Sequence, residues 1–171
     1  MPATNNHVAG TVVLAGLIAG TIDVAAASLI NWLSPVVILQ AIASGLIGKA
    51  SFAGGATTAL LGLLLQWSIS ILIAAIYLAA TVPLAALRGR WRLSGVIAGV
   101  VIFLVMNYLV VPLSAAPFRP RLDFHELLTA FTPYKFVANL LAMILFGLII
   151  AFLMRNSVQT GPLTGESARP L

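Results

Sequence analysis

The sequence contains no cysteine, and only 8% of its residues are charged. The missing cysteine excludes disulfides, thiolate nucleophiles and cysteine-based metal sites. Soluble domains carry about 25% charged residues, whereas this chain of 171 residues is 61% hydrophobic and has too little polar surface to cover a water-exposed globule. We therefore expect one small integral membrane domain that is solvated mostly by the lipid bilayer.

Motifs of familiar catalytic chemistry are missing as well. The sequence has no His-Glu-x-x-His, no Gly-x-Ser-x-Gly, no phosphate-binding P-loop and no Gly-x-Gly-x-x-Gly. Ser44, Ser51 and Ser70 lie among small residues without a histidine or lysine base in register. We therefore expect a protein that is not an enzyme and that holds no cofactor.

Four apolar stretches are long enough to cross a bilayer, whose hydrocarbon core of about 30 Å needs about 20 residues of helix. They cover residues 8–33, 52–80, 93–113 and 136–154. A shorter helix is expected over residues 35–48, because Ser34 is a good N-cap and Pro35 suits the first helical position. It is too short to span, so it is either interfacial or re-entrant. The sequence predicts an all-α integral membrane protein with four transmembrane helices in a bundle and short interfacial or re-entrant helices.

The remaining segments are expected to lie outside the bilayer. Asp123 and Glu126 can cap a short amphipathic helix over residues 123–131, which suits the membrane surface. Asp123, His125 and Glu126 are also residue types that bind metals, but the capped helix explains them, and we expect no metal site. The polar residues 155–171 are predicted to form a disordered tail.

Asp23 is the only charged residue of the first span. A carboxylate at that depth costs about 2.5–3.5 kcal/mol on insertion scales, so it should face protein or water. Gly16 and Gly20 share its helix face and allow a second helix to approach closely. Gly55 and Gly62 are expected to pack in the same way in the second span. The first span is therefore predicted to turn its carboxyl group towards another helix.

Each of the other three spans also contains a polar amide, namely Gln66, Asn107 and Asn139. If the spans alternate in direction, these amides and Asp23 form one polar layer, which lies at the midplane of the bilayer or on its outer side. Two interpretations stay open. The layer is a hydrogen-bond cluster that holds helices together, each bond contributing about 0.6 kcal/mol on average, or it is a small-solute or ion site with Asp23 as its only charge.

Part of the chain, about residues 50–117, resembles a known family. The resemblance is carried by Phe52-Ala53-Gly54-Gly55, Gly62, Gln66, Tyr77, a basic loop, Leu93-Ser94-Gly95, Ala98-Gly99, Asn107 and Pro112-Leu113-Ser114. It is similar to the YagU-like bacterial inner-membrane proteins, a multi-span group of unsettled function, and implies that location and a multi-span fold. Histidines of the family correspond to Gln66 and Asn107, and because neither amide titrates, a proton-handling role does not carry over.

The nine basic and four acidic residues give a net charge of +5. No dense basic run or basic helix face is present, so we expect no nucleic-acid partner; cationic flanks that orient a membrane protein explain the charge. A cytoplasmic N-terminus places five basic residues inside (Arg88, Arg90, Arg92, Arg155 and Arg169) and four outside (Lys49, Arg119, Arg121 and Lys135). Both termini are therefore expected in the cytoplasm.

Two functions follow from these patterns. The first is a structural or accessory membrane protein that assembles, through its glycine-rich faces, as a homo-oligomer or within a larger membrane complex. The alternative is a small transporter or channel-like protein with a polar intramembrane site around Asp23.

Overall fold

The computed structural model describes residues 3–81, 83–84, 89–117 and 133–159. Within these ranges the chain is helical and contains no strand. Five helical stretches are long and apolar enough to cross a membrane, one more than the four predicted spans. They cover His7–Asn31, Pro35–Ala53, Gly55–Thr81, Trp91–Leu113 and Pro133–Asn156.

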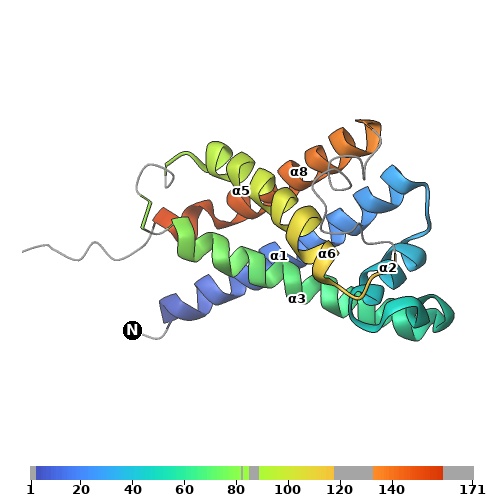
Figure 1. Ribbon diagram of the computed structural model, residues 1–171. Coiled ribbons are helices and arrows are strands. Elements are labelled where there is room, and N and C mark those ends of the chain that lie inside the picture. Colours follow the sequence, from blue (N-terminus) through green and yellow to red (C-terminus); the bar gives the residue numbers. More distant parts are fainter. Residues whose placement is uncertain (1–2, 82, 85–88, 118–132, 160–171) are drawn as a thin grey trace, which may run out of the picture.

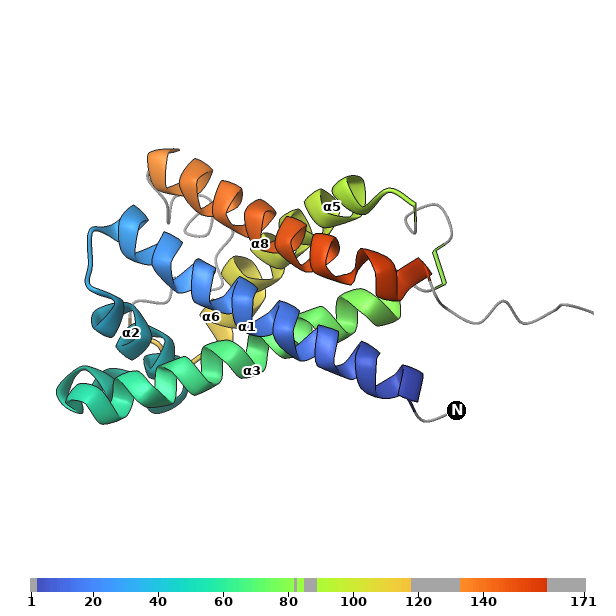
Figure 2. The same cartoon turned by 180° about the vertical axis from the view of Figure 1, so that it is seen from behind.

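The centre of the bundle is helix α1 (Ala3–Asn31), which packs against α3 (Gly55–Thr81) and α8 (Pro133–Gln159). Both partners run antiparallel to α1 (Figures 1 and 2). Lys135, at the start of α8, contacts Asn31 at the end of α1, with Nζ 3.3 Å from Oδ1. The first residues of α1 and the last residues of α8 therefore lie at the same end of the bundle.

Helix α5 (Trp91–Val105) packs antiparallel along α8. The Trp91 ring lies 5.5 Å from the Phe152 ring at one end of the contact, and Phe103 lies 5.2 Å from Phe136 at the other. Between them the two backbones approach closely, because a Cβ built on Gly99 would lie only 2.5 Å from a backbone atom of α8. With α5 antiparallel to α8, the four long helices alternate in direction along the chain.

The helix after α5 changes its winding. A π-helical segment, η2 (Met106–Val110), leads into the short α6 (Val111–Leu113). Pro112 has no backbone N–H to continue regular i→i−4 bonding, and its ring crowds the preceding turn. The predicted third span thus ends where expected, at Leu113, and Pro112 lies between the π-helical widening and that end.

Residues 34–54 form a broken helical segment rather than one straight rod. Helix α2 (Pro35–Ile47) begins after Ser34, whose hydroxyl accepts a 3.4 Å hydrogen bond from the Val37 backbone N–H. It ends at Gly48, which has a φ of 65° and lies in the left-handed region that favours glycine. A 3₁₀-helix, η1 (Gly48–Ala53), follows and leads back towards the start of α3 (Figure 1).

The buried core lies where α1, α3 and α8 meet. Small side chains of α1, Ala15 and Ala19, are fully buried there against large side chains of α8 such as Ile150 and Met154. The buried face of α1 is therefore broader than the predicted Asp23 face, since α1 has partners on two sides. Val13, which the spacing puts on the Asp23 face, is 43% exposed.

The helix boundaries differ from the predictions mainly at the C-terminal end. Helix α8 continues to Gln159, past the expected end of the fourth span at residue 154. The Arg155 guanidinium lies 4.2 Å from the centre of the Phe152 ring and so packs on its own helix. Residues 155–159 are therefore helical rather than tail. The rest of the predicted tail, and the predicted helix over residues 123–131 with Asp123, His125 and Glu126, lie outside the described residues.

Candidate functional site

The carboxyl group of Asp23 meets the side-chain amide of Gln66 between α1 and α3. Gln66 Nε2 donates a hydrogen bond to Asp23 Oδ2 over 2.8 Å, and the same nitrogen lies 3.4 Å from the Gly20 carbonyl oxygen. Gln66 is buried and Asp23 is partly buried. The acid of α1 thus has a partner within the protein, as a polar group in an apolar environment requires.

Close backbone approach makes this contact possible. A Cβ built on Gly16 would lie 2.5 Å from the Ile71 Cα, and one on Gly20 would lie 2.5 Å from the Ser70 hydroxyl. On the same side of α3, Trp67 Nε1 donates to Thr21 Oγ1 over 3.1 Å. The two glycines therefore let α3 lie near enough for side chains as short as Asp23 and Thr21 to reach across.

Asn107 and Asn139 do not join this pair. Asn107 Nδ2 donates to the Phe103 carbonyl over 2.8 Å, and Asn139 Nδ2 donates to the Lys135 carbonyl over 2.7 Å. Both bonds lie within the residue's own helical turn. The structure thus brings Asp23 and Gln66 into contact, while each asparagine bonds its own helix.

A partly open cavity of about 500 Å³ lies next to Gln66 and is bordered by α1, α2, α3, the segment after α5, and α8. Its walls are mostly apolar, and Gln66 and Asn139 are two of its few polar lining residues. Its apolar walls include Ala27, Ile42, Ile69 and Val110. Gln66 therefore both bonds Asp23 and lines the cavity, whereas Asp23 itself is not a lining residue. The π-helical segment contributes Met106 and Val110 to the cavity wall.

The glycines predicted to pack helices have different surroundings. A Cβ on Gly62 would clash with the Leu39 backbone of α2, so α2 covers this face. A Cβ on Gly55 would meet nothing within 4 Å. Gly55 has a φ of 58° and serves the turn before α3 instead of helix packing, which corrects the expectation from its spacing.

Sequence reasoning missed two interior contacts between helices, although it had named Tyr77, Gly95 and Gly99. Gly95, Gly99 and Gly147 form the tight contact between α5 and α8, and the Gly95-x-x-x-Gly99 spacing was the available signal. The Tyr77 hydroxyl lies 2.7 Å from the Ser94 hydroxyl in a buried bond between α3 and α5. Tyr77 follows Gln66 by three helical turns, so it shares the polar face of α3.

Within the described residues, no group of three His, Cys, Asp or Glu side chains could hold a metal ion. Comparisons of the chain with protein-family models, with curated proteins and with solved structures find no match. The arrangement around Asp23 therefore has to be interpreted from its own geometry.

Proposed function

We propose that the chain is an integral membrane protein whose bundle is solvated by lipid. The support is the outward display of large apolar side chains along all the long helices. Leu29 is 73% exposed, Leu141 59% and Leu60 57%. Surface of this kind is unfavourable in water when it is contiguous, and α-helices meet the requirement that every backbone polar group in a bilayer be satisfied internally.

We further propose four spans, with Pro35–Ala53 as a re-entrant segment. If that stretch crossed the bilayer, α1 and α3 would run in the same direction, whereas they are antiparallel in both views (Figures 1 and 2). Helix α2 has 13 residues and is therefore about 20 Å long, too short for a core of about 30 Å. The bend at Gly48 fits a segment that enters and leaves on one side.

The ends of the bundle carry the residue types of a membrane interface. Trp32, which is 87% exposed, and Tyr134 lie where α1 ends and α8 begins, and Trp91 lies beside Arg90 and Arg92 at the opposite end. Aromatic residues gather at both interfaces, and basic residues favour the cytoplasm. We therefore assign the Arg90 end, with the N-terminal end of α1 and the C-terminal end of α8, to the cytoplasm. The resemblance to YagU-like proteins makes the bacterial inner membrane the proposed location.

Within that membrane we propose a structural or accessory role. The observation that carries this proposal is the 2.8 Å hydrogen bond between Asp23 and Gln66, which engages the one carboxyl group of the spans in helix packing. Gly16, Gly20 and Gly62 are covered by other helices of the same chain. An oligomer or larger complex would therefore use other, lipid-facing surfaces.

A second candidate function is the binding or passage of a small, largely apolar solute. The observation in its favour is the cavity of about 500 Å³ lined by Gln66 and Asn139, with a π-helical segment in its wall. Such segments frequently occur at functional sites. A ligand there would have two side-chain amides as hydrogen-bond partners.

The topology can be tested with single-cysteine variants, because the natural chain has no cysteine. Trp32→Cys lies before the re-entrant segment, Ala56→Cys lies just after it, and Arg90→Cys marks the opposite side. We expect a membrane-impermeant maleimide added to spheroplasts to label the first two variants and not the third. Labelling Trp32→Cys and Ala56→Cys from opposite sides would overturn the four-span proposal.

A cavity-filling variant separates the two functions. A Cβ on Gly45 would lie 3.7 Å from Ser114 Cβ, so Gly45→Leu extends from α2 into the cavity without a backbone clash. A structural role predicts unchanged or slightly raised thermal stability and the same cellular phenotype as the wild type. Loss of a co-purifying small molecule, or of its density in a cryo-EM map, with stability unchanged would favour the binding function instead.

A further inference from the structure

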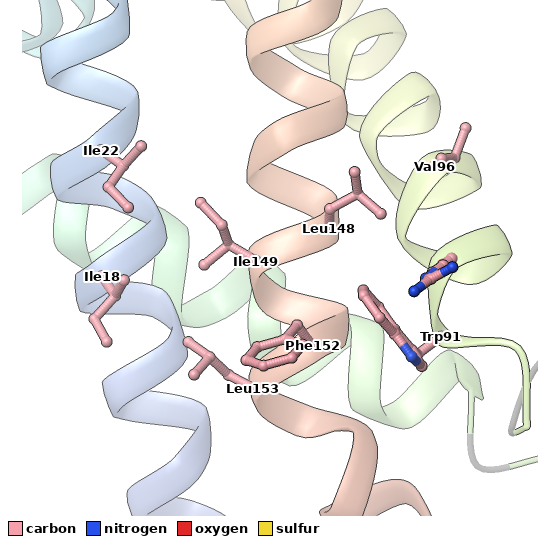
Figure 3. A pocket seen from close by; sticks show the side chains of 9 residues that line it. Ile18, Ile22, Trp91, Val96, Leu148, Ile149, Phe152 and Leu153 are labelled. Atoms are coloured by element: carbon pink, nitrogen blue, oxygen red, sulfur yellow. The ribbon is translucent and has the colours of Figure 1, made fainter.

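An open apolar groove of about 660 Å³ runs along the bundle between α1, α5 and α8. Figure 3 shows α8 between the other two helices, with Ile149 and Leu153 towards α1 and Trp91 reaching towards Phe152. The lining is aliphatic and aromatic except for Arg92. The groove is separate from the cavity beside Gln66, with which it shares no lining residue.

Two arginines lie at the Trp91 end of this groove: Arg92 lines it, and Arg155 stacks on the lining residue Phe152. The Arg92 guanidinium lies 5.3 Å from the centre of the Trp91 ring, and the Arg155 guanidinium lies 4.2 Å from that of Phe152. Because the two rings are themselves in edge-to-face contact at 5.5 Å, the arginines are held at the same end, one from α5 and one from α8. Stacking on aromatic rings orients a guanidinium while leaving its N–H donors available for an anion.

No carboxylate of the described part of the chain neutralises these arginines. Asp23 is the only acidic residue in the described ranges, and it bonds Gln66. The groove thus joins an apolar channel, which suits an acyl chain, to two oriented cations, which suit a phosphate.

We propose that the groove is a binding site for an anionic glycerophospholipid. The headgroup phosphate binds Arg92 and Arg155, and the acyl chain lies along the groove towards Ile22 and Val96. Basic pockets between transmembrane helices bind anionic headgroups by this chemistry. The inference rests on the proposed membrane location, since only there is such a lipid the normal neighbour of the groove.

The test uses the full chain, purified in a mild non-ionic detergent and incubated with phosphatidylglycerol and phosphatidylcholine of identical acyl chains. Native mass spectrometry then counts each bound lipid. We expect the wild type to prefer phosphatidylglycerol and Arg92→Gln/Arg155→Gln to lose on the order of 30-fold in apparent affinity for it. The matched control, Lys49→Gln/Lys135→Gln, removes the same charge at the opposite end and should keep the preference.

Two further variants keep the proposal falsifiable if the double glutamine variant fails to fold. Arg92→Lys/Arg155→Lys retains the charge without the planar donor pairs and should recover only part of the affinity. Val96→Trp fills the groove and should weaken lipid binding with both arginines intact.

The proposal is overturned if the wild type binds both lipids equally, if the lysine control loses as much affinity as the arginine variant, or if Val96→Trp has no effect. Displacement of the lipid by millimolar inorganic phosphate also overturns it, because the acyl chain would then contribute nothing. If instead the proposed membrane location is wrong, a different result is expected: alkaline carbonate would release the chain from the membrane without detergent.

Discussion

Replacing Gln66 by leucine should destabilise the bundle by leaving the Asp23 carboxyl group without its 2.8 Å donor. Interhelical hydrogen bonds in membrane proteins contribute about 0.6 kcal/mol on average and up to about 1.7. Orphaning a buried acceptor adds a desolvation penalty of about 1–3 kcal/mol. Leucine recovers part of this loss through apolar packing, so we expect Gln66→Leu to lower the free energy of unfolding by about 1–3 kcal/mol.

The double variant Asp23→Leu/Gln66→Leu distinguishes this reasoning from a simple packing effect. Replacing both partners by apolar groups removes the orphaned acceptor, so the double variant should be more stable than the single variant Gln66→Leu. Asp23→Asn keeps an acceptor oxygen and should cost less than about 1 kcal/mol. Asn139→Leu is the matched control, because among the described residues its amide bonds its own helix, and it should change stability little.

The measurement is equilibrium unfolding in mixed micelles with increasing sodium dodecyl sulfate, followed by tryptophan fluorescence. Trp67 lies on α3 next to Gln66 and bonds Thr21 across the same contact, so it is well placed to report separation of α1 and α3. The reasoning is refuted if Gln66→Leu unfolds like the wild type, or if the two leucine substitutions are simply additive.

Other substitutions test the rest of the packing. Gly99→Ala places a methyl group against the backbone of α8 and should cost about 1–3 kcal/mol in a thermal unfolding assay, whereas Gly10→Ala, with open space around it, should not destabilise; equal effects would contradict the close approach. Tyr77→Phe removes the 2.7 Å bond to Ser94 and should lower stability by about 0.5–1.5 kcal/mol, and no change in the unfolding midpoint would show that the bond contributes nothing. Gly48→Ala forces a non-glycine residue to a φ of 65° and a ψ of −150°, a combination essentially restricted to glycine, and should cost about 1–3 kcal/mol in the same assay; an unchanged unfolding midpoint would contradict the bend after α2.

The features that the sequence predicted well depend on local chemistry. Ser34 followed by Pro35 marks the start of α2, because capping and a fixed φ act within one helical turn. The buried face of α3 follows helical spacing through Gly62 and Gln66, since one face of that helix meets the other helices.

The features that the sequence did not predict depend on which helices pack against one another. Asn107 can satisfy its amide on its own Phe103 carbonyl, and spacing alone does not distinguish this from a bond to another helix. Gly55 matches the pattern of a packing glycine and yet serves a turn, because a glycine spacing does not say whether a neighbour is present. The sequence predicted four spans, whereas five helical stretches in the described part of the chain are long and apolar enough to cross a membrane, because the stretch from Pro35 stays helical past Gly48 as far as Ala53.

At the cavity wall that contains the π-helical segment, the number of residues matters more for the shape of the wall than the identity of their side chains. Met106 and Val111 both line the cavity although they are five positions apart, a separation that points side chains about 140° apart on a regular α-helix. The wider winding of residues 106–110 brings them to one side. Swapping one aliphatic residue for another there should be tolerated, whereas deleting a single residue would rewind the turn and move Val111 out of the wall.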